Sequence, residues 1–403
     1  MEEVKGVRSF TAGIWVKVGS RNEHPAKNGC SHFLEHMFFK GTKKRTARDI
    51  AFETDSVGGD INAFTSKENT AFYVKVLDVH LEKGLDLLTD IFCHSLLTEE
   101  DVERERGVIQ EEIKMVDDTP DDLIHDLFSK DLWGQDGLGQ PVLGDRKTVK
   151  ALMRQDLLGH IRRFYGTVDT IVSCAGSFDH DKVISLLNAK LGGLRRGSEP
   201  KLDHYPGFKS QVHLYPKDLS EVHLCLGLEG LKQADPERYE YYILNTVFGA
   251  GLSSRLFQEI REKRGLVYTI YSYISSYSDA GLWGVYAGTG KKKLEEVMSL
   301  TLKFLKEIPD DLHESELAKA KEQLKGNLLL GLESTQSRMQ NIAKQEIYFG
   351  RYFSPAEIIR EIDAVSLKKL KELAEKLVKG KSPALTILGP VDSKLFGKAL
   401  PAL

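Results

Sequence analysis

The sequence is poor in cysteine. Only four occur in 403 residues, Cys30, Cys93, Cys174 and Cys225, and no two of them form a Cys-x-x-Cys pair. This spacing argues against a zinc knuckle and against a thioredoxin-type site. Four isolated cysteines in so long a chain favour reduced thiols over a disulfide framework, which is typical of proteins in a reducing compartment.

The sequence also lacks a long apolar run and an excess of either charge. No apolar stretch approaches the ~18 residues that would suggest a membrane span. The N-terminal sequence MEEVKGVR has neither the apolar segment of a secretory signal nor the composition of a transit peptide. The 56 basic and 59 acidic residues give a net charge of -3. The chain therefore lacks the excess of positive charge that is typical of nucleic-acid-binding proteins. We therefore expect a cytoplasmic protein with neither a membrane nor a nucleic-acid partner.

The chain is long enough for two domains of about 200 residues each. A segment over 195–211 contains two prolines, two glycines and several charges without periodicity, which is typical of a linker. We predict domains over 1–194 and 212–403. Each half opens with an alternating strand, Gly13–Gly19 and Val222–Gly227, and continues with a helix, further strands and a long amphipathic helix. This order indicates a duplicated α/β unit.

Neighbouring runs of strand precede runs of helix in both halves. Residues 63–77 predict one strand pair, and residues 268–277 and 281–288 predict an antiparallel pair. The later helix over 97–113 is echoed by residues 312–328. The pattern predicts an α+β fold of two homologous layered domains with mixed or antiparallel sheets, and disfavours a doubly wound parallel sheet.

Two histidines stand four residues apart in the string His32-Phe-Leu-Glu35-His36. On a helix they share one face, so both imidazoles can reach one metal ion, and imidazole is a favoured zinc ligand. Glu35 lies beside them, where it can accept a proton from water. The order reverses the better-known His-Glu-x-x-His motif and is the inverzincin signature. For a match this short, taken alone, hydrogen-bonded polar groups in a helix core are the favoured interpretation.

An acidic helix is predicted from Glu99, with Thr98 as its N-cap and Pro120 beyond its end. Glu105 and Glu112 stand seven residues apart on it, and so two turns apart on one face. Taken by spacing alone, these carboxylates are more typical of a solvated helix surface than of ligands.

The motifs together resemble the pitrilysin (insulinase) family of zinc peptidases. Glu112 follows His36 by 112 − 36 = 76 residues, a suitable spacing for that family. The strings HFLEHMFFKGT and ERERGVIQEEI are similar to the mitochondrial processing peptidase subgroup. The resemblance implies one Zn2+ per chain, held by His32, His36 and Glu112. It also implies that Glu35 is the general base and that Glu105 supports the site by orienting a ligand.

Two further segments carry the resemblance. Residues 58–65, GGDINAFT, match the strand edge on which the family lays its substrate, which implies that Asn62 and Ala63 contact the peptide backbone. Residues 252–268 match a segment with an Arg/Tyr pair, which implies that Arg261 and Tyr268 contact the substrate in the chamber. Without the family, a charged helix end followed by a buried strand tyrosine explains this pair equally well.

The resemblance implies a zinc-dependent endopeptidase that hydrolyses unfolded peptides. Longer members join two such units in one chain, so a chain of this length is expected to form a homodimer around a closed chamber. The C-terminal domain lacks the zinc ligands. Two alternatives stay open: a non-catalytic scaffold subunit of the same fold, and a maturase dedicated to one precursor peptide.

Overall fold

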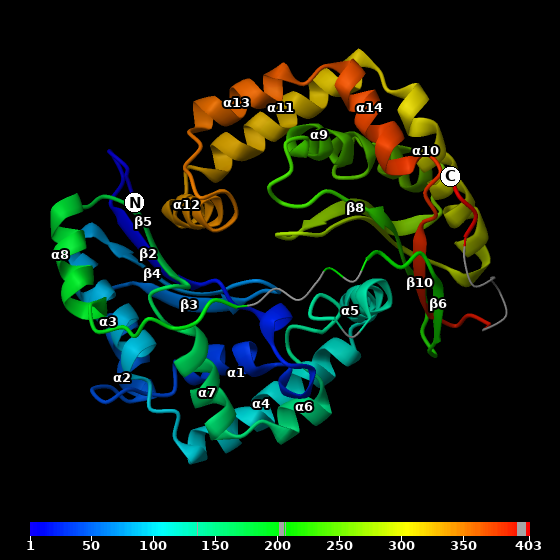
Figure 1. Cartoon of the computed structure of the whole chain (residues 1–403). Coiled ribbons are helices and arrows are strands. Elements are labelled where there is room, and N and C mark those ends of the chain that lie inside the picture. Colours follow the sequence, from blue (N-terminus) through cyan, green and yellow to red (C-terminus); the bar gives the residue numbers. More distant parts are fainter. Residues whose placement is uncertain (135, 201–204, 206, 393–399) are drawn as a thin grey trace. The chain divides into compact units, whose positions relative to one another are not determined.

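The computed structural model describes residues 1–134, 136–200, 205, 207–392 and 400–403, which form two compact units (Figure 1). Unit 1 comprises Met1–Met115, Gln135–His204 and Gly331–Tyr352. Unit 2 comprises Val116–Gly134, Tyr205–Leu330 and Phe353–Leu403. Within the described parts of the chain, no helix is both long and apolar enough to cross a membrane.

The sheet of unit 1 has five strands. Their order is β1 (Glu2–Glu3), β5 (Thr170–Gly176), β2 (Ser9–Val16), β4 (Thr70–Leu77) and β3 (Asp60–Thr65). The β1–β5 pair is parallel and the other pairs are antiparallel. The strand β3 therefore lies at an edge, next to β4 only.

The sheet of unit 2 repeats this plan. Its order is β6 (Val212–Pro216), β10 (Ala384–Gly389), β7 (Val222–Glu229), β9 (Gly281–Thr289) and β8 (Val267–Ser276). Here too the outer pair, β6–β10, is parallel and the rest are antiparallel. The predicted fold of two homologous domains with mixed sheets is confirmed.

One strand begins earlier than predicted. Expected over Gly13–Gly19, β2 runs over Ser9–Val16. All but its first residue are buried, because both faces of the sheet are covered at this strand. A strand buried on both faces shows little alternation at its start, so its N-terminal half escapes a search for alternating residues.

The helices of unit 1 pack mainly on one face of its sheet. They are α1 (Cys30–Met37), α2 (Ala47–Ser56), α3 (Leu81–His94), α4 (Glu99–Asp117), α6 (Arg146–Ala151), α7 (Arg154–Phe164) and α8 (His180–Leu191). The predicted cap of α4 is present, since the Thr98 hydroxyl accepts a hydrogen bond from the amide of Asp101 at 3.1 Å. Short 3-10 turns are η1 (Ser20–Asn22), η2 (Pro25–Lys27) and η3 (Asp78–His80).

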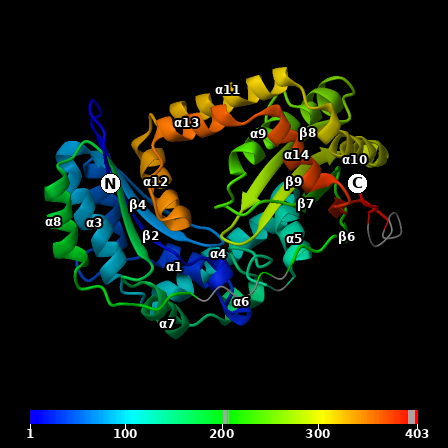
Figure 2. The ribbon, with the colours of Figure 1, turned by 45° about the horizontal axis from the view of Figure 1, so that its top comes forward.

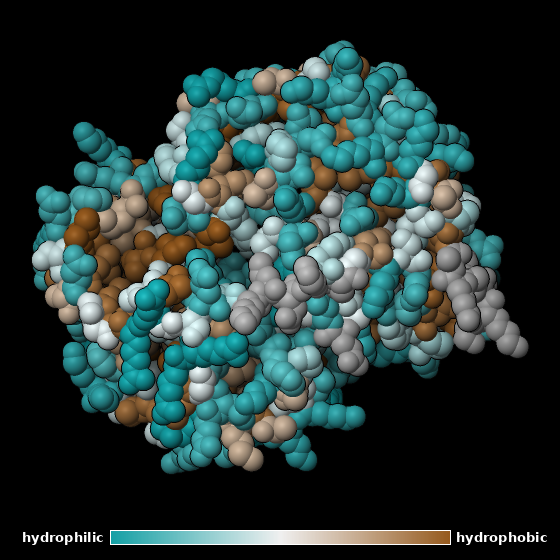
Figure 3. Space-filling view, in the orientation of Figure 1, coloured by the Kyte–Doolittle hydropathy of each residue, from teal (hydrophilic) through white to brown (hydrophobic). Residues whose placement is uncertain are grey.

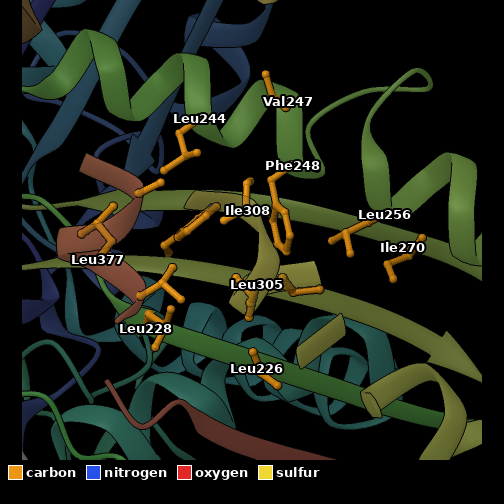
Figure 4. Close-up of a cluster of buried hydrophobic side chains, with 14 of the residues drawn as sticks. Leu226, Leu228, Leu244, Val247, Phe248, Leu256, Ile270, Leu305, Ile308 and Leu377 are labelled. Carbon is orange, nitrogen blue, oxygen red and sulfur yellow. The ribbon is translucent and has the colours of Figure 1, made fainter. Parts of the chain in front are cut away.

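The core of unit 2 lies between its sheet and a layer of helices. These are α9 (Arg238–Phe248), α10 (Leu294–Asp311), α11 (Glu314–Gly331), α13 (Pro355–Ala364) and α14 (Leu367–Val378), with the short segments η4 (Phe257–Glu262) and η5 (Lys291–Lys293). Leu226 and Leu228 of β7 meet Phe248 of α9, Leu305 of α10 and Leu377 of α14 in this core (Figure 4). All five are at most 5% exposed.

Two helices belong to the compact unit whose strands come from the other half of the sequence. The helix α12 (Thr335–Phe349) lies on β2 and β5 of unit 1 (Figures 1 and 2). There Met339 and Ala343 pack with Trp15 and Tyr73. The helix α5 (Pro120–Trp133) lies on β7 and β10 of unit 2, the counterparts of β2 and β5.

The strands β1–β5 precede the predicted division at 195–211 and β6–β10 follow it, whereas the compact units exchange α5 and α12 across it. Residues 201–204 and 206 of the predicted linker lie outside the described residues. Hydrophilic residues cover most of the face seen in Figure 3, and hydrophobic residues gather over the sheet of unit 1 near β2 and β5.

Candidate metal centre and active site

The helix α1 begins at a specific anchor. Gly29 is its N-cap, with a φ of 94°. The carboxylate of Glu23 accepts hydrogen bonds from the amides of Gly29 (2.7 Å) and Ser31 (2.5 Å) and from the side chain of Asn28 (3.0 Å). Glu23 therefore satisfies free amides at the positive end of the helix that carries both histidines.

Sequence reasoning missed Glu23. Helix caps are sought at the residue next to the helix, here Gly29 or Ser31, whereas Glu23 reaches back from the preceding loop. Burial raises the pKa of Glu23 to about 7, although its hydrogen bonds with Ser31, Gly29 and Asn28 lower it. No local pattern in the sequence indicates that this acid is buried.

Three predicted ligands come together in unit 1. Nε2 of His32 lies 3.6 Å from Oε2 of Glu112, and Nε2 of His36 lies 3.5 Å from the same oxygen. All three ligand atoms lie within 4.8 Å of one another. Donors about 2.0–2.2 Å from a tetrahedral ion are separated by about 3.4 Å, and the distances from Glu112 to the two histidines are close to this value. Two imidazoles and one carboxylate are a donor set typical of catalytic zinc.

For His32 and Glu112, the environment favours the protonation states that metal ligands need. Burial lowers the pKa of His32 to about 4, which keeps its imidazole neutral. A hydrogen bond from His36 lowers the pKa of Glu112, which keeps it a carboxylate. Burial lowers the pKa of His36, but its bonds to Glu112 and Glu105 outweigh this and raise it overall. The trio thus combines a neutral donor with an anionic one.

Glu105 and Lys40 form a chain behind His36. Oε2 of Glu105 lies 3.2 Å from Nδ1 of His36, and Oε1 of Glu105 forms an ion pair with Nζ of Lys40 at 2.7 Å. Glu105 is only 3% exposed. A carboxylate on Nδ1 orients the ring and directs Nε2 toward the ligand position. Lys40, which sequence reasoning did not single out, balances the charge of Glu105.

Glu35 lies on the same helix and is held by the sheet. The Thr65 hydroxyl donates to Oε2 of Glu35 at 2.6 Å. Burial raises the pKa of Glu35, while the hydrogen bonds from Thr65 and the charge of His36 lower it. A raised pKa suits a group that must accept a proton near neutral pH and release it again.

Asn62 and Ala63 lie on the edge strand β3, as expected for a strand that adds a peptide. Oδ1 of Asn62 accepts a hydrogen bond from the amide of Ala63 at 2.8 Å. The strand ends at Thr65, the residue that contacts Glu35. An extended peptide added along this edge would thus run toward the glutamate.

Arg261 and Tyr268 lie in unit 2, and the trio lies in unit 1. Arg261 stands in the π-helical turn η4, with its guanidinium 4.6 Å from the ring centre of Phe257. Tyr268 sits at a bulge in the edge strand β8 and is 78% exposed. The alternative of a buried strand tyrosine is therefore wrong. A bulge turns a side chain out of the regular alternation of a strand, which is why the exposure of Tyr268 was not evident from the sequence pattern.

Comparisons with known proteins agree with this arrangement. Residues 2–146 match the family described as Insulinase (Peptidase family M16), and residues 151–324 match the Peptidase M16 inactive domain. The chain belongs to this insulinase family of peptidases. The three candidate ligands His32, His36 and Glu112 all lie in the first matched region.

Relatives align over almost the whole chain. An uncharacterized zinc protease of Streptomyces coelicolor is 40% identical over 98% of this chain and 87% of its own length. The uncharacterized zinc protease YmxG of Bacillus subtilis is 41% identical over 97% of this chain and 95% of its own length. A solved structure of a peptidase M16 inactive domain from Pseudomonas fluorescens has a TM-score of 0.90 at 18% identity, covering 97% and 95% of the two chains. At this level of identity, the similarity to the solved structure shows the fold alone.

Proposed function

We propose that the chain is a zinc-dependent endopeptidase that hydrolyses unfolded peptides, with one zinc ion per chain. The observation that carries this proposal is the convergence of His32, His36 and Glu112 on one position. Glu35, on the same helix as the two histidines, lies beside them and is not itself one of the ligands. The bacterial relatives are named zinc proteases, which supports zinc as the metal.

In this proposal Glu35 performs the proton transfers. Zinc bound by the trio would supply Lewis-acid catalysis, polarising the scissile carbonyl and lowering the pKa of water. Glu35 accepts a proton from the attacking water and then donates it to the leaving amine, so that it ends each cycle as a carboxylate. Glu105 orients His36, and its own charge is balanced by Lys40.

The remaining predicted residues would bind the substrate. Asn62 and Ala63 would hold the peptide backbone along the edge of β3. Arg261 would donate to a peptide carbonyl through its rigid guanidinium, and the exposed Tyr268 would place its hydroxyl near the developing oxyanion.

We also infer a homodimer whose chains enclose the reaction chamber, and a cytoplasmic location. The location is supported by four free cysteines, of which three are buried. Light scattering on the purified chain should give twice the chain mass of 45.3 kDa. A monomer at working concentration would contradict the dimer and leave the chemistry to be tested separately.

The peptidase is tested by cleavage of an unstructured, internally quenched fluorescent peptide, with zinc measured in the same samples. The native chain should cut the peptide, and a chelator should stop it. Glu35→Gln should bind zinc as the native chain does but turn over at least about 100-fold more slowly, because it cannot accept the proton.

Other outcomes distinguish the alternatives. A native chain that takes up no zinc would indicate a scaffold subunit without catalysis. A chain that binds zinc but cuts only one sequence from a broad peptide library would indicate a maturase for a single precursor.

A further inference from the structure

Thr65 is the contact between the edge strand and the glutamate of the site. It is the last residue of β3, and its hydroxyl donates to Oε2 of Glu35 at 2.6 Å. Hydrogen bonds to a charged acceptor are shorter and about twice as strong as neutral ones, so a distance of this size marks a strong contact.

The backbone around Thr65 is fixed on both sides. Thr65 pairs with Thr70 across β4, and the hydroxyl of Ser66 closes the turn by donating to the carbonyl of Asn69 at 2.9 Å. The same turn is tied to η1, since the Ser20 amide donates to the carbonyl of Ser66 at 3.1 Å. Thr65 therefore holds its hydroxyl in one place without help from the substrate.

The neighbouring glycine shows how closely this turn is packed. A Cβ added to Gly19 would lie 2.2 Å from the carbonyl oxygen of Ser66. The strand end and the segment before η1 thus meet backbone to backbone. A hydroxyl carried on such a support can orient a flexible partner, whereas a glutamate on its own has three side-chain torsions to fix.

We infer that Thr65 is a positioning residue for the peptidase reaction: its hydroxyl holds Oε2 of Glu35 so that Oε1 is the oxygen that transfers the proton. This inference rests on the proposed peptidase activity. It also explains why the base lies beside the strand that would carry the peptide, because the same residue ends that strand and orients the base.

The test compares Thr65→Val, which keeps the shape without the hydroxyl, with Thr65→Ser, which keeps the hydroxyl. For Thr65→Val we expect kcat to fall about 10- to 100-fold with KM within about twofold, because only the orientation of the base is lost. Thr65→Ser should recover kcat to within about threefold of the native chain. Zinc content should be the same in all three proteins.

Thr70→Val is the matched control. Thr70 is the cross-strand partner of Thr65, and its hydroxyl donates to the carbonyl of Val18 at 2.9 Å, away from Glu35. This variant loses a buried hydroxyl that bonds a backbone carbonyl and should keep its kcat. Equal losses in the two valine variants, or a Thr65→Ser protein as slow as Thr65→Val, would overturn the inference.

A second measurement is independent of activity. Crystal structures of the native chain and of Thr65→Val, each with zinc bound, should show Glu35 in one orientation in the native chain and turned or divided in the variant. An unchanged Glu35 in the variant overturns the inference even if neither protein cuts peptide. A native chain that cuts no peptide contradicts the proposed function instead.

Discussion

At the scale of single residues, the candidate site depends on carboxylates with different surroundings. Glu105 is buried between His36 and Lys40, whereas Glu103, two residues earlier on α4, has an exposed side chain paired with Arg106. Both belong to the same run of acids in the sequence. Their different contacts explain why spacing alone favoured a solvated helix surface for all of them.

We predict that Glu105→Gln weakens zinc binding about 10- to 100-fold, because the amide orients His36 less firmly and leaves Lys40 unbalanced. Competition with a chromogenic chelator measures this affinity. Glu103→Gln, on the same helix but exposed, is the control and should bind zinc as the native chain does. Equal affinities in the two variants would show that Glu105 has no role in the metal centre.

Asp169 gives a prediction for stability. It is 1% exposed, and neither of its carboxylate oxygens has a hydrogen-bond partner among the described residues. Burial raises its pKa from 3.8 to about 6, with Lys17 lowering it and Glu199 raising it. Between about pH 4 and pH 6, Asp169 is therefore protonated in the folded state and ionised in the unfolded state.

Because this pKa is raised, the contribution of Asp169 to the free energy of unfolding is present below about pH 4 and lost as the pH rises through about 6. Asp169→Asn should therefore be more stable than the native chain by about 1–3 kcal/mol at pH 8 and nearly equal to it at pH 4. Urea unfolding at both pH values measures the difference. A constant difference across the range would contradict the raised pKa.

At the scale of elements, the start of α1 determines where both histidines point. A Cβ on Gly29 would lie 2.6 Å from the carbonyl oxygen of Leu143, and its φ of 94° is strained for any other residue. A one-residue change in the start of the helix would rotate His32 and His36 by about 100° away from Glu112.

Gly29→Ala should accordingly lower the free energy of unfolding by about 2–4 kcal/mol and reduce zinc binding. Gly58→Ala is the control, since Gly58 has a φ of 58° but no heavy atom within 4 Å of an added Cβ. It should cost about 1 kcal/mol and keep its zinc. Comparable loss of zinc in both would mean that the positive φ, and not the contact with Leu143, is what matters.

Much of this element-scale structure could be predicted from sequence because it is local. The face shared by His32 and His36, the Thr98 cap and the strand pair within residues 63–77 follow from periodicity and turn residues within a few positions. The anchor at Glu23 and the bulge at Tyr268 could not be predicted, because each depends on contacts with segments that no local pattern identifies.

At the scale of the whole molecule, the duplication was visible in the order of elements, but the exchange of α5 and α12 was not. Each helix is amphipathic in the ordinary way, and nothing in its sequence says which of two similar sheets it covers. Tertiary contacts, such as those of Met339 and Ala343 with Trp15 and Tyr73, assign α12 to unit 1.

The exchange predicts that a fragment covering 1–200 does not fold alone, because β2 and β5 lack their covering helix. Co-expression with a fragment covering 205–403 should restore a compact protein with a buried Trp15. The same fragment without residues 335–349 should fail to do so. Tryptophan emission and protease resistance of the purified mixtures measure this, and a stable, resistant fragment 1–200 would contradict it.

The exchanged helix also sets the order of events during synthesis. Unit 1 includes Gly331–Tyr352, so its sheet still lacks the covering helix α12 when residue 204 leaves the ribosome. At about 5–20 residues per second, the 352 − 204 = 148 further residues take roughly 7 to 30 s to translate. For that time the face of β2 and β5 is without its cover, which makes the nascent chain a client for chaperones that bind exposed apolar strands. We therefore expect the unit that holds the metal ligands to be completed only after the second half of the chain has been made.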